Sequence, residues 1–363
     1  MQNSLDVNNF INSISELSGS INSILQSDFF DKLSFYKKEQ LNKRLSTVKF
    51  DKIENIYLGK HLHNANPSNN INCIKLNDDF LLAPPKDIPN NTVFLLLNND
   101  VAKNLPQYIE FYNNSPNAFF IIWDWDSQHW LNMSMNLAIY SDFYIPASSE
   151  NLSVLSQFTP NILGPIFCCS FQWTKKFLID NIDLMLNERS NEPLGKHNLY
   201  DKYPRRNRVI FTLNKEFSKV CFSNNEFLEM TSFENLVEWS SYKCHWIVPV
   251  LSGVPIRVYN ALITGGIPIL PSIYKIMPEI QLLKDTPVYY DIDDIINPMH
   301  ISKFAIDKFE ALSESEIIGK ILSSIELHHL DTRCAQIINY INLEITRLKN
   351  NDKNYNFGYL SFI

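Results

Sequence analysis

The stretch GVPIRVYNALITGGIPILP, residues 253–271, decides the fold that we predict for the C-terminal half of the chain. Pro255 favours the start of a helix, because a proline in the first helical turn loses no hydrogen bond. Gly265 and Gly266 end this helix, and we expect one of them to adopt the positive φ of a helix C-cap. The apolar residues 267–270 then form a buried strand, so the stretch is one helix–strand unit of an α/β fold.

Arg257 indicates that this helix–strand unit binds an anion. It falls in the first turn of the helix, where unpaired backbone N–H groups and the helix dipole already favour an anion. A guanidinium group at such a position suits a diphosphate, because its planar donors bind phosphate oxygens in pairs. The alternative is an ordinary helix–strand unit with an arginine on its surface.

Outward from this stretch, apolar strands alternate with helices over most of the chain. Alternation of this kind predicts parallel βαβ units, and strands this apolar predict sheets that are covered on both faces. The predicted strands are residues 55–59, 92–97, 118–123, 142–145, 209–213, 245–250, 267–270 and 287–290, and the predicted helices are 101–112, 225–240, 255–264 and most of 301–350.

A polar stretch at residues 187–208 interrupts the alternation and is the predicted junction between two α/β halves. Ligands of such sheets bind beyond the carboxyl ends of the strands, so two facing sheets would place a ligand cleft between them. The predicted segments are an N-terminal helical extension (1–50), a first α/β domain (51–195), a second α/β domain that ends in helices (196–350) and a C-terminal tail (351–363).

The composition indicates an ordinary globular protein. Of the 363 residues, 45% are apolar and 20% charged, which excludes a disordered chain, and the net charge of −7 disfavours a nucleic-acid binder. The nine glycines form neither a G-x-G-x-x-G nor a P-loop pattern. The six scattered cysteines are expected to be free, mostly buried thiols, and no signal peptide or apolar run of about 20 residues is present. We therefore expect a cytoplasmic protein.

Residues 1–50 place apolar side chains at three- and four-residue spacing, as one face of a helix does. The basic pairs Lys37–Lys38 and Lys43–Arg44 on this helix allow peripheral association with an anionic membrane surface. The alternative, which we favour, is that these side chains lie on a solvated face of the helix.

The stretch at residues 253–271 resembles the donor-site motif of GT-B glycosyltransferases, in particular exostosin-like enzymes and bacterial enzymes of surface polysaccharide synthesis. Their pattern is D/S-x-P-x-R-x-x-[ED]-A-L-x-x-G-x-I-P-[IV]. Asn260 departs from it, because the family has there an acidic residue that often contacts the nucleotide ribose; an amide can still hydrogen-bond a hydroxyl group. The residues in register are Pro255, Arg257, Ala261, Leu262, Gly265, Gly266, Ile267, Pro268 and Ile269.

This resemblance implies two facing Rossmann-like domains, with the acceptor in the N-terminal domain and the nucleotide-sugar donor in the C-terminal one. It implies a glycosyltransferase that is inverting and metal-independent and needs no cofactor beyond the nucleotide sugar. Its acceptor would be a glycan or glycolipid of lipopolysaccharide or capsule synthesis. The donor contacts that the resemblance implies are Arg257, Asn260, Gly265 and Gly266.

A second donor-side element is expected at the end of the predicted strand over residues 209–213. In a GT-B enzyme the first strand of the C-terminal half ends at the donor phosphates, which makes Thr212, Asn214 and Lys215 candidate phosphate ligands. The alternative is a solvated loop. We interpret the two arginines at residues 205–206 as part of a charged linker.

Two carboxylates and a histidine stand at the carboxyl end of the third predicted strand, where parallel strands commonly deliver catalytic side chains. Inverting transfer needs a general base for the acceptor hydroxyl group, and we predict Asp126 or His129 for this role, with Asp124 as the weaker candidate. One of the first two is expected to open into the cleft opposite the donor-motif arginine. Trp125 and Trp130 suit the apolar face of an acceptor sugar. The alternative is a strand–loop junction with aromatic packing.

His61 and His63 follow the first predicted strand, where acceptor loops of GT-B enzymes usually lie. If this segment is extended, both side chains point to one side, and we predict that they contact the acceptor. The alternatives are a plain polar loop and a metal pair, for which the sequence offers no further ligands.

Two other functions compete with a GT-B enzyme. Asp124 and Asp126 also form a D-x-D pattern, with which GT-A glycosyltransferases hold a divalent cation on the donor diphosphate. The second α/β half with Arg257 argues against this hypothesis. The third hypothesis is a glycosyltransferase-like binding or assembly subunit without catalysis, for which Asn260 is the best support.

Overall fold

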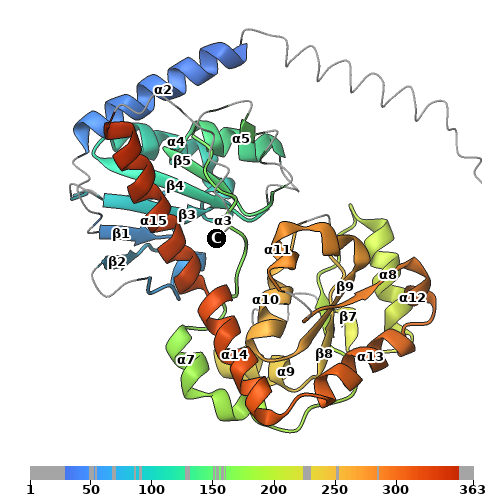
Figure 1. The fold of residues 1–363 in the computed structure, drawn as a ribbon. Helices are drawn as coiled ribbons and strands as arrows, with labels where there is room; N and C mark the ends of the chain where they lie inside the picture. The colour runs from blue at the N-terminus through green and yellow to red at the C-terminus, as the bar shows by residue number, and fades with distance from the viewer. Residues whose placement is uncertain are drawn as a thin grey trace, which may run out of the picture.

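The structure, a computed structural model, contains two α/β halves that lie side by side (Figure 1). A long C-terminal helix runs from one half onto the other. The residues that the structure describes are 29–48, 53, 55–67, 71–85, 87–89, 92–126, 131–149, 152, 155–156, 159, 161–223, 230–250, 253–283 and 286–350.

The N-terminal half is built on a five-stranded parallel sheet with the order β2-β1-β3-β4-β5. Four of its strands were predicted, and their positions are confirmed. The edge strand β2 was missed, because its four residues Asn-Cys-Ile-Lys have exposed ends and no apolar run. The strands are β1 (Asn55–Leu58), β2 (Asn72–Lys75), β3 (Thr92–Leu97), β4 (Ala118–Asp124) and β5 (Phe143–Pro146).

Both faces of this sheet are buried, as the apolar strands predict. Side chains of β3 alternate between the faces: Phe94 and Leu96 pack toward α4 (Leu105–Asn114) and α5 (Leu131–Ile139), whereas Leu95 packs toward α15 (Leu330–Lys349). In the chain β3 is followed directly by the short helices α3 (Asn98–Val101) and η2 (Ala102–Asn104).

Helix α2 (Phe29–Thr47) confirms a helix within residues 29–47, while the rest of the predicted N-terminal helix lies outside the described residues. The lysine Lys37 and the arginine Arg44 are almost fully buried, so both the membrane and the solvated-face interpretations are wrong for them. The Lys37 ammonium group donates to backbone carbonyls at the end of α5, and Arg44 forms an ion pair with Asp142 (3.0 Å). These contacts fix α2 to the N-terminal half.

The C-terminal half is also a parallel α/β layer. Strands β10-β9-β8 form one sheet and β6-β7 a second, and parallel bridges such as Leu194↔His245 set β6 beside β8. The order across the half is therefore β7-β6-β8-β9-β10, the same order as in the N-terminal sheet. The strands are β6 (Gly195–His197), β7 (Val220–Phe222), β8 (Cys244–Trp246), β9 (Ile267–Pro271) and β10 (Val288–Tyr290).

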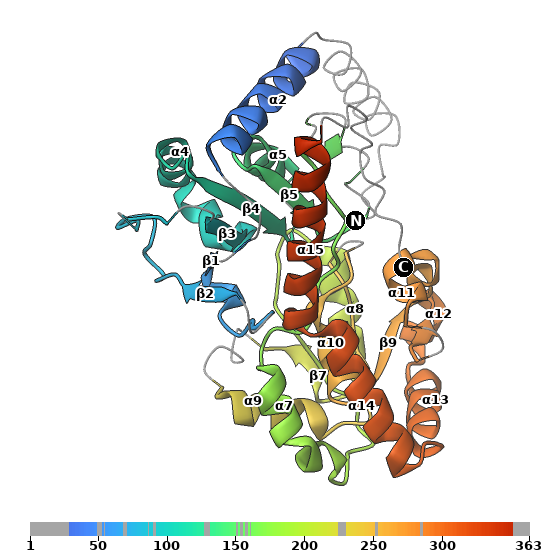
Figure 2. The ribbon, with the colours of Figure 1, turned by 60° about the vertical axis from the view of Figure 1, so that its left-hand side comes forward.

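Helices cover both faces of this second layer. Helices α8, α12 and α13 pack on one face, and α9, α10 and α14 pack on the other (Figures 1 and 2). The helices of this half are α7 (Lys175–Asp180), η3 (Ile182–Leu186), α8 (Pro204–Asn214), α9 (Ser232–Ser240), α10 (Ile256–Ile263), η5 (Ser272–Ile276), α11 (Pro278–Gln281), α12 (Ile292–Ile296), α13 (Met299–Glu310) and α14 (Glu314–His328).

The strand predicted over residues 209–213 is wrong, because these residues belong to helix α8. Pro204 stands in the first turn of this helix, where proline is tolerated. Ile210 and Leu213 are three residues apart and fully buried, whereas Phe211 is exposed, which is the pattern of a helix face. The first strand of the half is instead β6, which lies inside the polar stretch that was predicted as the junction.

The strand predicted over residues 245–250 is shorter, as β8, and the helix predicted over residues 225–240 is observed as α9, while residues 225–229 lie outside the described residues. The helix after Pro255 is α10, and the strands after it are β9 and β10. Gly265 has a φ of +80°, which confirms a positive-φ glycine at the end of α10. Of the six cysteines, all are free and four are buried. None of the described helices is both long and apolar enough to span a membrane.

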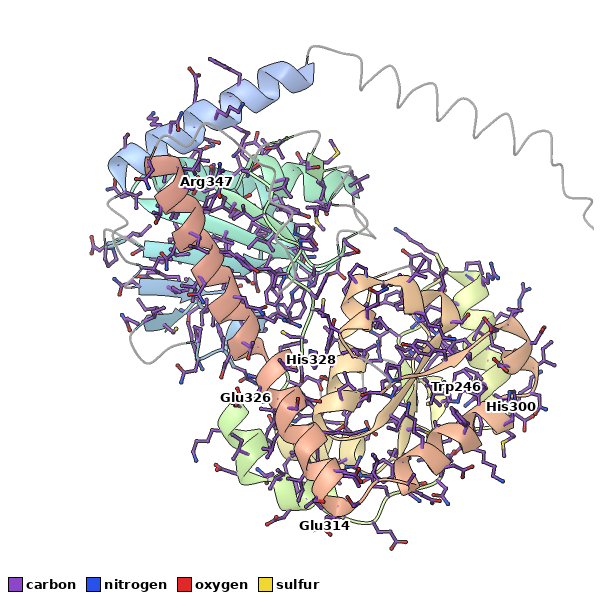
Figure 3. The ribbon with its side chains drawn as sticks, viewed as in Figure 1. Trp246, His300, Glu314, Glu326, His328 and Arg347 are labelled. Atoms are coloured by element: carbon purple, nitrogen blue, oxygen red, sulfur yellow. The ribbon has the colours of Figure 1, made fainter. Side chains whose placement is uncertain are left out.

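The two halves are joined at a double crossing of the chain. Ser170 N–H donates to the carbonyl of His328 (2.9 Å), and Leu330 N–H donates to the carbonyl of Ser170 (3.0 Å). Figure 3 places His328 where α14 gives way to α15, and Arg347 at the far end of α15 beside the N-terminal half. Helix α15 lies in the segment that the sequence assigned to the second domain, yet it packs on the first sheet.

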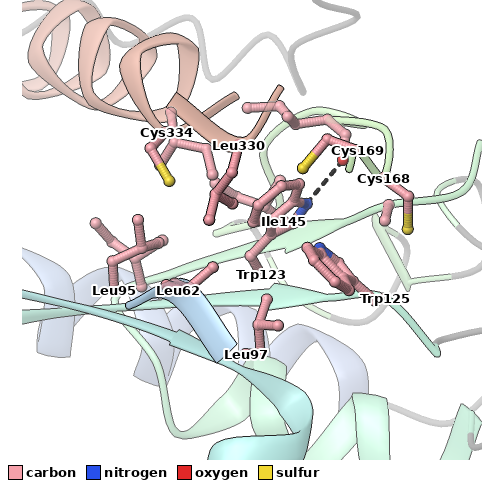
Figure 4. Packing of buried hydrophobic residues seen from close by; sticks show 14 of the residues in the cluster. Leu62, Leu95, Leu97, Trp123, Trp125, Ile145, Cys168, Cys169, Leu330 and Cys334 are labelled. Carbon is pink, nitrogen blue, oxygen red and sulfur yellow. Dashed lines mark hydrogen bonds between the residues drawn. The ribbon is translucent and has the colours of Figure 1, made fainter. Parts of the chain in front are cut away.

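One apolar core spans the contact between the halves. Its N-terminal members include Trp123 and Trp125, whose rings meet edge to face (5.0 Å between centroids), and its C-terminal members include Tyr259 of α10. In Figure 4 the two tryptophans lie beside Cys168, Cys169 and Leu330, and the dashed line marks the hydrogen bond from Trp123 Nε1 to the Ile166 carbonyl (2.7 Å). The two halves therefore share one continuous apolar core.

Candidate functional site

A cavity of about 210 Å³ lies between the carboxyl ends of the two sets of strands. Open parallel α/β sheets bind their ligands at this edge, and clefts between domains are common ligand sites. The lining side chains that bear on function are Asn99, Trp125 and Asp126 from the N-terminal half and Tyr200, Arg206 and Arg257 from the C-terminal half.

Arg257 occupies the first turn of α10, as predicted, and lines this cavity. Its Nε donates to the carbonyl of Lys196 in β6 (2.7 Å), which fixes the guanidinium group beside β6. Burial lowers the pKa of Arg257 from its ordinary value. The interpretation as a simple surface arginine therefore does not fit its position.

Arg206 lies next to Arg257 in the same cavity wall, and the interpretation of Arg206 as a charged linker is wrong. It is only 6% exposed, because helix α8 begins two residues earlier and turns this side chain inward. Its Nη1 donates to the Asn198 carbonyl (2.6 Å), and its guanidinium group lies over the Tyr200 ring at 5.5 Å. Burial, and then the charge of Arg257, lower the pKa of Arg206 to about 10.

The two guanidinium groups have no anionic partner among the described residues. The ionisable groups that act on Arg206 are Arg257, Tyr200 and Tyr290, and the one that acts on Arg257 is Tyr200; none of them is a carboxylate. His197 is buried beside them, and burial together with both arginines holds its pKa well below the usual range, so its ring is neutral. Arg206 is buried and Arg257 is partly buried. A buried cation without a counter-ion is costly, and an anion that enters the cavity would relieve this cost.

Asp126 faces this cationic wall from the N-terminal half. Its Oδ2 accepts hydrogen bonds from the side-chain amides of Asn98 and Asn99, both at 3.0 Å. Asp126 and Arg257 line one cavity from the two halves, so one of the two candidate bases lies at the predicted place. The other candidate, His129, lies outside the described residues, as does Trp130.

Trp125 lines the cavity beside Asp126, as a sugar-stacking residue would. It is only 7% exposed, and its ring packs edge to face against Trp123 and Phe171, with ring centroids 5.0 and 5.1 Å apart. A ligand in the cavity would therefore meet part of the Trp125 ring rather than its whole face.

Asp124 does not line the cavity, and its position gives no support to a catalytic role. Its carboxylate is fully buried on the opposite side of the strand, where it accepts hydrogen bonds from Ser134 Oγ (2.5 Å), from the Tyr144 hydroxyl group and from the Asp126 N–H (2.8 Å). Burial raises the pKa of Asp124 to about 6, although these hydrogen bonds oppose the shift.

The D-x-D hypothesis does not fit this arrangement. Both oxygens of Asp124 accept hydrogen bonds from donors inside the N-terminal half. Asp126 instead lines the cavity, so the two carboxylates do not point to one common metal position. Within the described part of the chain, no group of three His, Cys, Asp or Glu side chains is arranged to hold a metal ion.

Three predicted phosphate ligands lie away from the cavity. Thr212, Asn214 and Lys215 occupy the last turn of α8 and the residue after it, at the opposite end of the helix from Arg206. The Thr212 hydroxyl group donates to the Arg208 carbonyl (3.0 Å), as in an ordinary helix. Their assignment depended on a strand at this point, and the strand is absent.

The predicted donor contacts Asn260, Gly265 and Gly266 also lie outside the cavity lining. Asn260 is 1% exposed, and its Nδ2 donates to Gln172 Oε1 (2.9 Å). Gly265 and Gly266 stand at the far end of α10 from Arg257 and have packing roles. A Cβ on Gly266 would lie 2.4 Å from His245 Nε2, so only glycine fits there.

The two histidines predicted to contact an acceptor do not act together. The segment Lys60–Leu62 is a 3-10 helix and not extended, so the two histidine side chains do not point to the same side. His61 binds Asp100 through its Nδ1 (2.9 Å to Oδ1) and is partly exposed beside the carboxyl edge of the sheet. His63 lines a different hollow, between this segment and α7.

Sequence reasoning missed four members of this site: Tyr200, Arg206, Asn98 and Asn99. The asparagines directly follow a confirmed buried strand, which is the same signal that identified Asp126. Tyr200 and Arg206 follow β6, a strand too short to recognise.

Neither a protein-family model nor a curated protein matches this sequence. The functional assignment therefore depends on the chemistry of the cavity.

Proposed function

We propose that the protein is a glycosyltransferase of the GT-B type, with two facing Rossmann-like domains and a nucleotide-sugar donor bound between them. One observation carries the proposal: Arg206 and Arg257 line the cavity between the strand ends without a carboxylate partner among the described residues. Such a pair of guanidinium groups favours a ligand with two adjacent negative charges, and a diphosphate has this charge and size.

In this proposal the donor diphosphate binds Arg206 and Arg257. Tyr200 completes the donor wall, since its ring already lies against the Arg206 guanidinium group. As the bond between the anomeric carbon and the diphosphate oxygen breaks, negative charge grows on the leaving group. Guanidinium groups that are fixed by backbone carbonyls need not reorganise to stabilise that charge. They also supply the positive charge that a divalent cation supplies in GT-A enzymes.

The acceptor enters from the N-terminal side. Its hydroxyl group loses a proton to the Asp126 carboxylate and attacks the anomeric carbon with inversion, while the nucleoside diphosphate leaves with the bonding electron pair. Trp125 contacts the acceptor sugar and His61 one of its hydroxyl groups. A glycan or glycolipid of lipopolysaccharide or capsule synthesis is the acceptor class that the motif resemblance favours, and a cytoplasmic location belongs to the same proposal.

A ligand screen followed by a turnover assay tests this function. Thermal unfolding would be recorded with uridine, guanosine and cytidine nucleotides and their sugars; a ligand at 100 times its Kd stabilises by about 2.7 kcal/mol. We expect stabilisation by one nucleoside diphosphate and its sugar conjugate, and sugar transfer that persists in EDTA. No stabilisation by any nucleotide would contradict the proposal, and binding without turnover would favour the non-catalytic hypothesis.

A further inference from the structure

One four-residue turn lies between the two acceptor-side groups named above. Helix α3 begins directly after β3, and its first three residues all carry polar side chains: Asn98, Asn99 and Asp100. The two asparagines reach toward β4 on one side, and the aspartate reaches toward β1 on the other. Because β1, β3 and β4 are neighbours in the sheet, this turn spans the middle of the carboxyl edge.

Asn98 holds the end of β4 with both ends of its amide. The side chain is fully buried; its Nδ2 donates to Asp126 Oδ2 (3.0 Å), and its Oδ1 accepts from the Trp125 N–H (3.1 Å). Asn99 donates to the same carboxylate oxygen from the exposed side (3.0 Å). The Asp126 carboxylate is thus fixed by two amides from a single turn.

Asp100 holds His61 in a comparable way. Its Oδ2 accepts from the Leu97 N–H (2.8 Å), which locks the carboxylate, and its Oδ1 binds His61 Nδ1 (2.9 Å). The close approach requires Gly59, because a Cβ there would lie 1.9 Å from Asp100 Oδ2. With Nδ1–H donating to a carboxylate, the Nε2 lone pair points away from Asp100 and can accept a hydrogen bond from a hydroxyl group.

We propose that the turn Asn98–Asp100 is a positioning element that sets two acceptor-side groups at once, Asp126 for proton removal and His61 for acceptor binding. This inference depends on the proposed glycosyltransferase function. The turn acts through Asp126 and His61 and touches neither reacting atom. The turn has two arms: Asn98 and Asn99, which hold Asp126, and Asp100, which holds His61. Changes in the two arms should therefore affect different kinetic constants: the asparagine arm controls kcat, and the Asp100 arm controls the KM of the acceptor.

Several ionisable groups surround these two positions and could contribute to a pH profile. Asp124, the Tyr144 hydroxyl group and the Cys168 thiol interact electrostatically with Asp126 from its own half, and the two guanidinium groups of the donor wall line the same cavity as Asp126. Beside His61 lie Asp100 and Lys60, and Lys60 pairs with Asp78. Each variant below is therefore compared with the wild type over the whole pH range.

The first arm is tested by Asn98→Ala, with Asn99→Ala as the variant of an exposed residue that carries little risk for folding. We expect Asn98→Ala to lower kcat about 10²-fold, the usual cost of a misplaced group, with the donor KM unchanged. Asn99→Ala should also lower kcat, with the KM of donor and acceptor unchanged. A purely structural role would change kcat and both KM values together.

The second arm is tested by Asp100→Asn, which keeps the size of the side chain. Its amide would donate to His61 Nδ1, force the proton onto Nε2 and remove the acceptor lone pair. We expect the acceptor KM to rise about tenfold, with kcat and nucleotide affinity close to wild type. Gly59→Ala should have the same effect, because it displaces Asp100.

Asn136→Ala is the matched control, since Asn136 is exposed on α5 and its amide donates to the Asn132 carbonyl of the same helix (2.9 Å). Unfolding temperatures of all variants exclude a general loss of folding. If Asn98→Ala and Asp100→Asn change the same parameter, or if neither changes any, the inference is overturned although wild-type turnover remains. If the wild type itself shows neither nucleotide binding nor turnover, the proposed function fails instead.

Discussion

The two halves share one strand order but carry opposite chemistry at the carboxyl ends of their strands. In both, the second strand lies outside the first, and the later strands follow on the other side. At this edge the N-terminal half presents amides and the Asp126 carboxylate, whereas the C-terminal half presents Arg206 and Arg257. The comparison teaches that two sheets with one strand order can present opposite charges at the same edge, because the residues that follow the strands differ.

The largest expected effect comes from the carboxylate on the N-terminal edge. Asp126→Asn should lower sugar transfer 10²–10⁴-fold, because the acceptor hydroxyl group loses its base. Nucleotide affinity should stay near wild type, since the proposed function places the donor on the other half. Initial rates and calorimetric titration measure the two quantities, and Asp79→Asn, which removes an exposed carboxylate, is the control. Retained transfer would remove Asp126 from the mechanism.

Asp124, two residues away, should behave as a structural group. Its pKa of about 6 lies above its ordinary value of 3.8, so the folded protein binds more protons than the unfolded chain between these values. The stabilisation from Asp124 is complete below about pH 4 and is lost as the pH rises through 6. The difference in unfolding free energy between the wild type and Asp124→Asn should therefore fall by up to about 3 kcal/mol between pH 4 and 7.

Denaturant unfolding of both proteins at several pH values measures this difference. A constant difference would show that Asp124 is not buried as an acid in the folded protein.

On the C-terminal edge, Arg257→Ala should weaken nucleotide binding. A charge-assisted hydrogen bond contributes about 1.5–3 kcal/mol, which corresponds to a ten- to hundredfold rise in Kd. Arg257→Lys should also weaken binding, because an ammonium group lacks the planar pair of donors. Arg205→Ala, which removes an exposed arginine, should leave the Kd unchanged. Equal nucleotide affinities of the wild type and Arg257→Ala would show that Arg257 does not bind the donor.

The smallest effect sharpens the distinction between ligand and packing positions within the donor motif. Gly265→Val should destabilise the protein by more than about 1 kcal/mol, because φ is +80° and the new side chain would start 2.9 Å from Ile321 Cγ1. The nucleotide Kd of the folded variant should not change. Gly319→Ala is the control, because nothing lies within 4 Å of its Cβ position. A large loss of nucleotide affinity in Gly265→Val would show that Gly265 contributes to nucleotide binding as well as to packing.

The sequence predicted the N-terminal half better than the C-terminal half, and the reason is strand length. β3 and β4 have six and seven buried residues, so their apolar runs are unambiguous. β6, β7 and β8 have only three residues each. The apolar run at residues 209–213 therefore resembled a strand more than the true strand at 195–197 did. The segment is a helix in the folded protein, where Ile210 and Leu213 lie on one helix face and pack into the core.

The candidate site was predictable where a side chain directly follows a recognised strand or opens a recognised helix. Asp126 and Arg257 satisfy this condition, and the structure brings them to one cavity. Arg206 could not be placed, because its direction depends on the start of α8 at Pro204. Asn260 and Gly266 were placed correctly in the chain, but whether a helix residue faces a ligand or another segment, such as Gln172 or His245, depends on tertiary contacts.

The central claim is that Arg206 and Arg257 form a diphosphate site, and calorimetric titration of one nucleoside as its diphosphate and as its monophosphate tests it most directly. The account predicts that the wild type binds the diphosphate at least about tenfold more tightly, and that Arg206→Ala removes most of this preference while Arg205→Ala keeps it. Because the prediction concerns a ratio of two affinities in one protein sample, partial unfolding of the variant would not produce it. Equal affinities for the two nucleotides in the wild type, or an unchanged preference in Arg206→Ala, would contradict the claim.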